Sequence, residues 1–309
     1  MSLNISTKTF FEKFIVVFQV VMITTFTVNS LNAQVTGNKP GIFYSITGKG
    51  LKDTSWLFGT FHLVNESYLN EVPQAREVFK KAKGVVVEIV IDSSELQAAQ
   101  QYAISKDKKL TDLLDKSFLD SLEAELKNNI GAGVDQFNQL KPANVTLTLS
   151  IIHLIKNNSV QLAKYTGLPL DAYFAGAGKE MKKIIIPLET IREQMELLFN
   201  SQSLEQQAEA LKTFLRKKTE MMKLSDKLLQ SWFSHDMNAM NKIYQQTMEL
   251  SGEEDYLVKE RNLRWMKVLP GLLQKQSQFI AVGALHLAGQ FGLVEQLKQS
   301  GYTVTPLKL

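Results

Sequence analysis

Two short stretches of the sequence place a histidine three residues after a glycine, each at the end of an apolar run. The first ends in Gly59 and His62, and the second ends in Gly283 and His286. The chain has only four histidines, and with 17 glycines in 309 residues this repetition exceeds what random spacing gives. An imidazole at a strand end can bind a metal ion or move a proton. We therefore interpret the two motifs as halves of one site.

Each motif taken alone has a plainer interpretation. The glycine could serve tight packing rather than the approach of a substrate or a metal to the backbone, and a single histidine is more often a hydrogen-bonded core residue. Only the recurrence favours a shared site. The other two histidines are not assigned to it: His153 lies mid-helix, and Ser234-His235-Asp236 resembles a helix cap. The latter is no catalytic triad, because triad members meet in space rather than by adjacency.

Two glutamates belong to apolar runs that read as strands. Glu88 interrupts the run Val85–Ile91, and Glu189 follows the run that starts at Lys183. A carboxylate in a buried run needs a cation or a set of donors. Glu88 could therefore pair with an arginine or lysine across the sheet, or face a site at the strand end. The two histidine motifs at strand ends favour the site.

Together these residues predict a defined chemistry. Ligands of open α/β sheets bind outside the carboxyl ends of the strands, and two imidazoles with one or two carboxylates suit a divalent transition metal. Such a metal lowers the pKa of bound water and polarises a carbonyl, while a free carboxylate can act as general base. Arg261 could pair with a buried carboxylate or hold an oxyanion, or it could lie on a solvated helix face.

The hydrophobic pattern predicts the elements that position these residues. Strands are expected over 42–46, 56–61, 85–91, 183–190, 277–285 and 302–307. Helices are expected over 73–82, 93–106, 117–128, 142–156, 191–199, 203–223, 238–250 and 253–276. A short helix is expected to begin at Gly167–Asp171, and a loop with a helix is expected over 289–299. The fold class is therefore α/β or α+β: a mixed sheet built from the N- and C-terminal parts, with a large central helical region.

The N-terminus has the layout of a secretory signal peptide. Lys8 and Lys13 precede an apolar run over 14–28, and Ala33 offers a cleavage site, so we expect export to the periplasm or the extracellular space. The alternative is a retained membrane anchor, but the run is shorter than the roughly 20 residues that span a bilayer. The prediction is a signal peptide over 1–33 and a single domain over 34–309, without stable membrane insertion.

Composition narrows the partners. The formal net charge is +4, and it falls only to +3 without the signal peptide, so no nucleic-acid partner is expected. There is no cysteine, so the exported protein must be stable without disulfides. The sequence contains no P-loop, no Gly-x-Gly-x-x-Gly and no His-Glu-x-x-His. The oligomeric state is not predicted.

Taken together, the motifs resemble those of a known family. In chain order they are Leu57-Phe-Gly-Thr-Phe-His62, the strand with Glu88, Gly167-Leu-Pro-Leu-Asp171, Leu188-Glu-Thr190 with Gln194, Glu260-Arg-Asn262, and Val282-Gly-Ala-Leu-His-Leu287. The paired Gly-x-x-His motifs with a glutamate between them, followed by Gly289 and Gly301-Tyr302, are similar to the TraB/GumN family, relatives of the Tiki metalloproteases. The resemblance covers nearly all of the chain after the signal peptide.

The resemblance implies a fold shared with erythromycin-esterase-like and Tiki proteins, and a metal-dependent peptidase acting on a peptide or protein. Manganese or cobalt is favoured as the metal, with zinc as a further candidate. The implied metal ligands are His62, His286, Glu88 and Glu189. The implied catalytic residues are Glu88, Glu189 and Arg261, and we assign Gly59, Gly283, Asp171 and Asn262 to substrate binding.

Relatives are also linked to pheromone shutdown or haem binding, and fold does not dictate function. A non-catalytic protein that binds peptides or small ligands is therefore one alternative. An ester hydrolase on the same scaffold is another.

Overall fold

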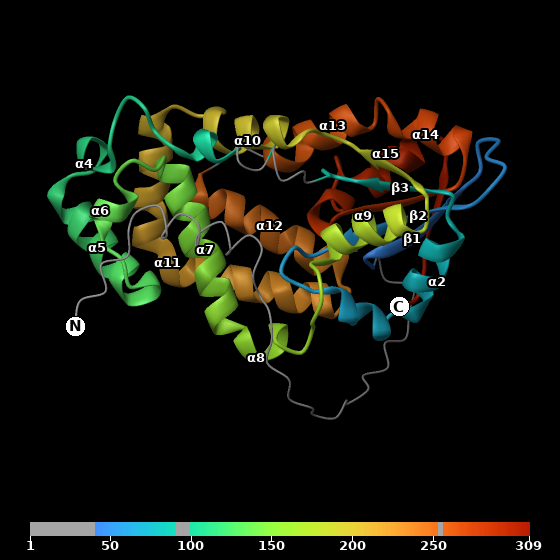
Figure 1. The fold of residues 1–309 in the computed structure, drawn as a ribbon, viewed down its shortest axis with the longest axis horizontal. Helices are drawn as coiled ribbons and strands as arrows, with labels where there is room; N and C mark the ends of the chain where they lie inside the picture. Colours follow the sequence, from blue (N-terminus) through green and yellow to red (C-terminus); the bar gives the residue numbers. More distant parts are fainter. Residues whose placement is uncertain (1–40, 91–94, 96–98, 253–255) are drawn as a thin grey trace.

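A sheet and a helical region lie side by side in the molecule (Figure 1). The computed structural model describes residues 41–90, 95, 99–252 and 256–309. The expected signal peptide over 1–33 lies outside these residues. No helix among the described residues combines the length and apolar character that crossing a membrane requires.

The sheet has six strands in the order β4-β3-β5-β2-β1-β6. They are β1 (Phe43–Thr47), β2 (Ser55–Thr60), β3 (Gly84–Val87), β4 (Ile184–Pro187), β5 (Gln278–Gly283) and β6 (Thr303–Pro306). Strands β4, β3, β5 and β2 are parallel, while β1 runs antiparallel to both β2 and β6. This confirms a mixed sheet assembled from the two ends of the chain. Its four parallel strands all end at one edge.

Helices make up most of the middle of the chain, and others near its two ends pack around the sheet. They are α2 (Pro73–Lys81), α4 (Leu110–Leu113), α5 (Lys116–Ile130), α6 (Val134–Phe137), α7 (Pro142–Asn157), α8 (Ser159–Leu162), α9 (Leu170–Glu180), α10 (Ile191–Asn200), α11 (Leu204–Phe233), α12 (Met237–Ser251), α13 (Arg261–Trp265), α14 (Leu269–Lys275) and α15 (Leu293–Gln299). Short 3₁₀ turns form η1 (Glu66–Asn70), η2 (Gln100–Ala103) and η4 (Ala284–Leu287), and η3 (Tyr256–Glu260) is π-helical.

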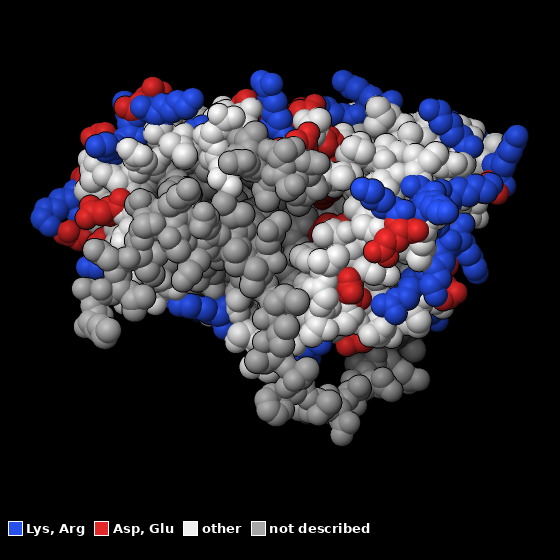
Figure 2. Space-filling model, viewed as in Figure 1, with Lys and Arg blue, Asp and Glu red and all other residues white. Residues whose placement is uncertain are grey.

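Two clusters of buried apolar side chains correspond to the two ends of Figure 1. The larger one packs around the sheet and includes Trp232 near the end of α11. The second joins α4, α5, α6 and α7 to the first half of α11. Helix α11 therefore belongs to both clusters and connects the helical region to the sheet. On the face displayed in Figure 2, lysines and arginines are interspersed with aspartates and glutamates.

Several expected strands are shorter than the sequence indicates, among them the one expected over 183–190, which is Ile184–Pro187 in the structure. The strand expected over 85–91 ends at Val87, and the Glu88 carbonyl beyond it accepts hydrogen bonds from the N–H groups of Leu188 and Glu189, which follow β4. The strand expected over 277–285 ends at Gly283, and His286 lies in η4. The helix expected over 93–106 falls partly outside the described residues, and η2 is the described helical segment there.

The prediction of one continuous helix over 253–276 is wrong. The described part consists of η3, α13 and α14, with a break between Trp265 and Leu269. Pro270 accounts for this break, because it has no N–H to donate to the carbonyl four residues earlier and instead stands in the first turn of α14. Conversely, α11 continues ten residues past its expected end and is kinked at Lys217.

Candidate functional site

The carboxyl edge of the parallel strands gathers the residues that the sequence singled out. His62 follows β2 by two residues, Glu88 directly follows β3, and Glu189 follows β4. Gly283 ends β5, and His286 stands three residues later in η4. Because β2, β5, β3 and β4 are neighbours in that order, all of these positions lie along one edge of the sheet.

His62 is the exposed histidine of the site. Its Nδ1 lies 2.8 Å from Asp171 Oδ2, and the Thr60 hydroxyl donates to the other oxygen of this carboxylate at 2.5 Å. Asp171 stands in the first turn of α9. The charge of Asp171 raises the pKa of His62 to about 9, against the opposing effect of desolvation. The His62 side chain is 68% exposed, so solvent screens part of this attraction.

The space over Gly283 is bordered by several of these groups. A Cβ placed on Gly283 would lie 3.1 Å from Glu88 Oε1, 3.7 Å from His62 Nε2 and 3.7 Å from His286 Cδ2. Since His62 Nε2 and His286 Cδ2 both lie 3.7 Å from this Cβ position, these two ring atoms are separated by at most twice that distance. Since Nδ1 of His62 binds Asp171, its second nitrogen is the one that reaches this space. The two glycine-histidine motifs do meet at one place.

His286 is held in one tautomer. Its Nδ1 lies 2.8 Å from Asn262 Oδ1, and the amide nitrogen of Asn262 donates to the carbonyls of His286 and Phe291. Oδ1 of Asn262 must therefore accept, which places the imidazole proton on Nδ1. Burial lowers the pKa of His286 to about 3, and the ring packs on Trp265 at 4.3 Å between centroids. His286 is a neutral imidazole with a lone pair on Nε2.

Arg261 occupies the centre of the buried half of the site. Its Nη1 donates to His286 Nε2 at 2.9 Å, and its Nη2 donates to Glu88 Oε2. Nη2 and Nε also donate to the two oxygens of Glu189, at 2.6 and 3.2 Å. The guanidinium packs over the Trp265 ring. Arg261 is buried, so the alternative hypothesis, that it lies on a solvated helix face, is wrong.

Glu88 pairs with an arginine, as one of its two hypotheses expects, and it also lies beside Gly283. It is 5% exposed, it pairs with Arg261, and its Oε1 accepts the Gly283 N–H at 2.6 Å next to the open space. Burial would raise the pKa of Glu88, but the neighbouring positive charges and the Gly283 N–H lower it to about 2. Glu88 is therefore an anion that faces the site and is compensated by an arginine.

Glu189 is the second carboxylate that binds Arg261. The turn after it is fixed by a capping box, in which the Thr190 hydroxyl accepts from the Glu193 N–H at the start of α10. Gln194 donates to Glu189 Oε1 at 3.2 Å. The carboxylate is thereby presented to Arg261, with which it forms a buried ion pair. Glu189 orients Arg261 and has no contact with either histidine.

Gly59 differs in role from Gly283. A Cβ on Gly59 would lie 2.9 Å from the Cα of Ala284 and 3.2 Å from Leu287 Cδ2, so its lack of a side chain lets β2 pack against η4. The Gly59 carbonyl accepts the indole N–H of Trp232 on α11 at 3.0 Å. The structure thus places Gly59 in packing between elements rather than beside the open space.

The expected metal ion can be tested against these contacts. In type, the donors fit: two imidazoles, each oriented by a second residue, and a carboxylate face one space. In position, they do not. His286 Nε2 and Glu88 are both bound by Arg261, and among the described residues no three histidine, aspartate or glutamate side chains stand close enough to hold a metal ion. In this arrangement the cation of the site is Arg261.

Comparison with known proteins agrees with the motifs that build this site. A model of the TraB/PrgY/gumN family matches residues 42–306, a span that contains every strand of the sheet and every residue of the site. The chain belongs to the TraB/PrgY/gumN family. No curated protein and no solved structure matches it. The family model thus establishes the family of the chain, and the activity of this member has to be inferred from its own site.

Two of the residues expected to bind substrate contact the histidines of the site. Asp171 binds His62, and the fully buried Asn262 binds His286. Thr60 and Trp265 were not predicted. A usable signal existed for each: Thr60 ends the strand two residues before His62, and Trp265 follows Arg261 by four residues, so that this second pair shares one face of α13.

The two remaining histidines lie elsewhere. His153 contacts Glu125 on α5, and His235 contacts Tyr68 at the junction of α11 and α12. Asp236 caps α12 through the Ala239 N–H, as the Ser-His-Asp pattern indicates.

Proposed function

We propose that this TraB/PrgY/gumN protein is an exported hydrolase, acting on peptide bonds, in which His62 activates a water molecule in the space over Gly283. The observation that carries the proposal is the bond between His62 and Asp171. It directs the free nitrogen of His62 toward this space, beside an ionised carboxylate and close to a buried arginine. The choice of peptides, and export itself, rest on the family resemblance and the N-terminal pattern.

The reaction step follows from the hydrogen bonds. When neutral, His62 carries its proton on Nδ1, where Asp171 accepts it, and Nε2 is free to take a proton from water. The water oxygen then bonds to the carbonyl carbon of the substrate. The imidazolium that forms is stabilised by Asp171 and can return the proton to the leaving amine as its bond to carbon breaks. Glu88 and the space over Gly283 hold the attacking water.

Arg261 supplies the positive charge near the developing oxyanion. Its guanidinium is fixed by Glu189 and Glu88, so it needs no reorganisation during the reaction. One of the two Nη1 hydrogens bonds His286, which leaves a second Nη1 hydrogen for an oxygen of the substrate. His286 and Asn262 therefore act as positioning residues for Arg261.

A second candidate is the metal-dependent form of the same hydrolysis. The orienting partners of His62 and His286 favour it, because metal-bound histidines usually donate their other N–H to an oxygen acceptor. The family resemblance favours manganese or cobalt, with zinc as a further candidate. This candidate requires Arg261 to release Glu88 and His286, and we derive no step through a metal from the present arrangement.

The test measures turnover of a fluorogenic peptide library and of simple aryl esters by the purified protein. We expect His62→Asn, which can still donate to Asp171, to reduce peptide turnover by about 10²–10⁴-fold, the range of a lost general base. Its melting temperature should stay close to that of the parent, because His62 is exposed. Equal turnover by His62→Asn would overturn the proposed role of His62.

A chelator separates the candidates. Activity that survives EDTA supports direct catalysis by His62, whereas activity lost with EDTA and restored by manganese, cobalt or zinc supports the metal-dependent form. Cleavage of esters but not peptides would assign an ester hydrolase. Stoichiometric peptide affinity without any product would instead identify a binding protein.

A further inference from the structure

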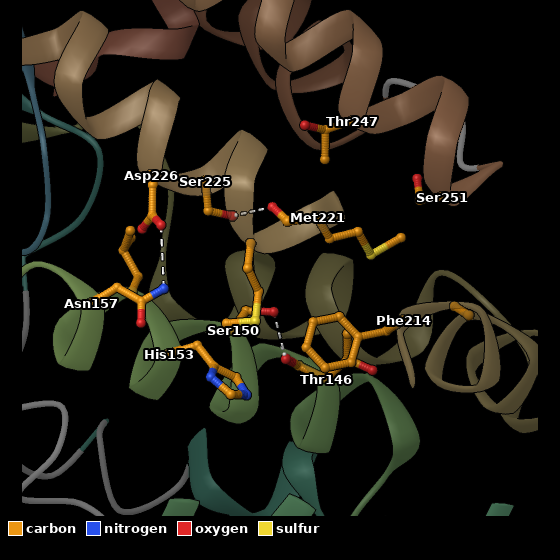
Figure 3. A pocket seen from close by; sticks show the side chains of 13 residues that line it. Thr146, Ser150, His153, Asn157, Phe214, Met221, Ser225, Asp226, Thr247 and Ser251 are labelled. Carbon is orange, nitrogen blue, oxygen red and sulfur yellow. Dashed lines mark hydrogen bonds between the residues drawn. The ribbon is translucent and has the colours of Figure 1, made fainter. Parts of the chain in front are cut away.

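We propose that the cavity between α7, α11 and α12 binds a small organic cation, specifically a primary ammonium with a short apolar tail. The cavity lies in the helical region, and Figure 3 shows side chains of all three helices lining it. Its volume is about 160 Å³, similar to engineered apolar cavities of about 150 Å³ that bind benzene. A ligand of five or six heavy atoms therefore fits.

The polar wall of the cavity offers acceptors. Five hydroxyls line it, and each donates its proton to a helix carbonyl. Four of them donate to the carbonyl four residues earlier: Thr146 to Pro142, Ser150 to Thr146, Ser225 to Met221, and Thr247 to Ile243. The fifth, Ser251, donates to Met248. Each oxygen retains lone pairs but has no second proton to give. A ligand that donates hydrogen bonds satisfies this wall, and a ligand that only accepts them does not.

One wall also carries an uncompensated carboxylate. Asp226 lines the cavity and accepts from the amides of Asn157 and Asn158, at 3.2 and 2.7 Å. In the part of the chain that the structure describes, its carboxylate forms no ion pair with a lysine, arginine or histidine. Two neutral amides orient the carboxylate without neutralising it. A cation in the cavity could form an ion pair with this half-buried carboxylate.

The part of the wall that Phe214, Met221 and Met222 of α11 form suits an apolar tail and a positive charge together. The ring of Phe214 is buried. An aromatic face attracts a cation, and methionine side chains are polarizable and adapt to the shape of a ligand. Lys217, where α11 is kinked, lies between Phe214 and Met221, so the kink separates the two halves of this wall.

The experiment titrates the purified protein with three probes of equal length by isothermal titration calorimetry. They are n-butylammonium, n-butanol and n-butyrate, which carry positive, zero and negative charge. We expect saturable 1:1 binding of n-butylammonium, at least about tenfold weaker binding of n-butanol, and none of n-butyrate. No saturable binding of n-butylammonium, or equal affinity for n-butylammonium and n-butanol, would overturn the proposal.

Variants locate the binding. Asp226→Asn should weaken n-butylammonium binding by about tenfold or more, the size of a lost charge-assisted hydrogen bond. Ala210→Met, which fills the cavity while removing no acceptor, should abolish it. Asp120→Asn on exposed α5 makes the same charge change outside the cavity and should bind like the parent. Unchanged affinity in Asp226→Asn, with native circular dichroism, would refute the assignment to this cavity.

Discussion

The twin glycines offer the sharpest test of how this site is built. Both Gly59 and Gly283 precede a histidine by three residues, yet their surroundings differ. Gly59→Ala should damage the fold, whereas Gly283→Ala should damage turnover and leave the fold nearly intact. Neither glycine has a positive φ, so alanine is acceptable to the backbone at both positions, and only the neighbouring atoms decide the outcome.

The distances give the magnitudes. An added methyl at Gly59 would meet the backbone of Ala284 at 2.9 Å and its Cβ at 3.0 Å, and such overpacking costs about 1–3 kcal/mol. For a chain of this size that corresponds to a fall in melting temperature of about 2–12 °C. At Gly283 the nearest atom is Glu88 Oε1 at 3.1 Å, which needs a shift of a few tenths of an ångström and costs less.

The functional effect is reversed. The methyl of Gly283→Ala fills the space between Glu88 Oε1 and His62 Nε2, where the attacking water is proposed to stand. We expect turnover to fall by about 10²-fold, the low end of a positioned general base. Peptide turnover and thermal melting of both variants are measured together. The control is Gly176→Ala in α9, where nothing lies within 4 Å of the added methyl. Full activity in Gly283→Ala would refute the proposed water position.

Three further predictions concern charge and proton position in the site. Asp171 raises the pKa of His62, so Asp171→Asn should move the rising limb of the kcat/KM profile down toward pH 6.5; an unchanged limb in the two pH profiles would argue against His62 as the base. Arg261→Met removes the arginine that binds both Glu88 and Glu189 and leaves Glu189 only the longer ion pair with Arg264. The free energy of unfolding at pH 7 should therefore fall by about 3–5 kcal/mol, as measured by urea denaturation; a loss below about 1 kcal/mol would show that the ion pairs do not hold the site. The pKa of His286 is lowered to about 3, so below pH 6.5 the unfolded chain gains a proton that the folded chain refuses, and stability should decline as pH falls from 6.5 toward 3. His286→Asn should reduce this decline in the same urea experiment, and an identical pH dependence in the variant would contradict a neutral buried His286.

Much of the frame was predictable because local patterns govern it. The uninterrupted apolar run before Glu88 indicates a strand buried on both faces, and Val85 to Val87 are indeed fully buried. A parallel sheet then brings its carboxyl ends to one edge, which is why residues from positions 62 to 286 could be assigned to one site before any distance was known.

The hydrogen bonds and ion pairs of the site were not predictable, because they join residues that are distant in the sequence. Asp171 is 109 residues from His62, and Arg261 is 173 residues from Glu88. Nothing in the local sequence shows which cation compensates which carboxylate, so the sequence favoured a metal ion where the structure places Arg261. The break before α14 was missed for a different reason: the amphipathic pattern continues through Pro270 although the hydrogen bonds cannot.

The register of the sheet explains why two identical spacings produce different roles. In the parallel pair of β2 and β5, Gly59 is aligned with Val282 and Thr60 is aligned with Gly283. The two glycines are therefore offset by one residue, and since side chains alternate along a strand they face opposite sides of the sheet. Gly283 shares its face with Thr60, whose hydroxyl binds the carboxylate that holds His62. The proposed site for water and substrate therefore lies on this side of the sheet, while η4 packs against Gly59 on the other side.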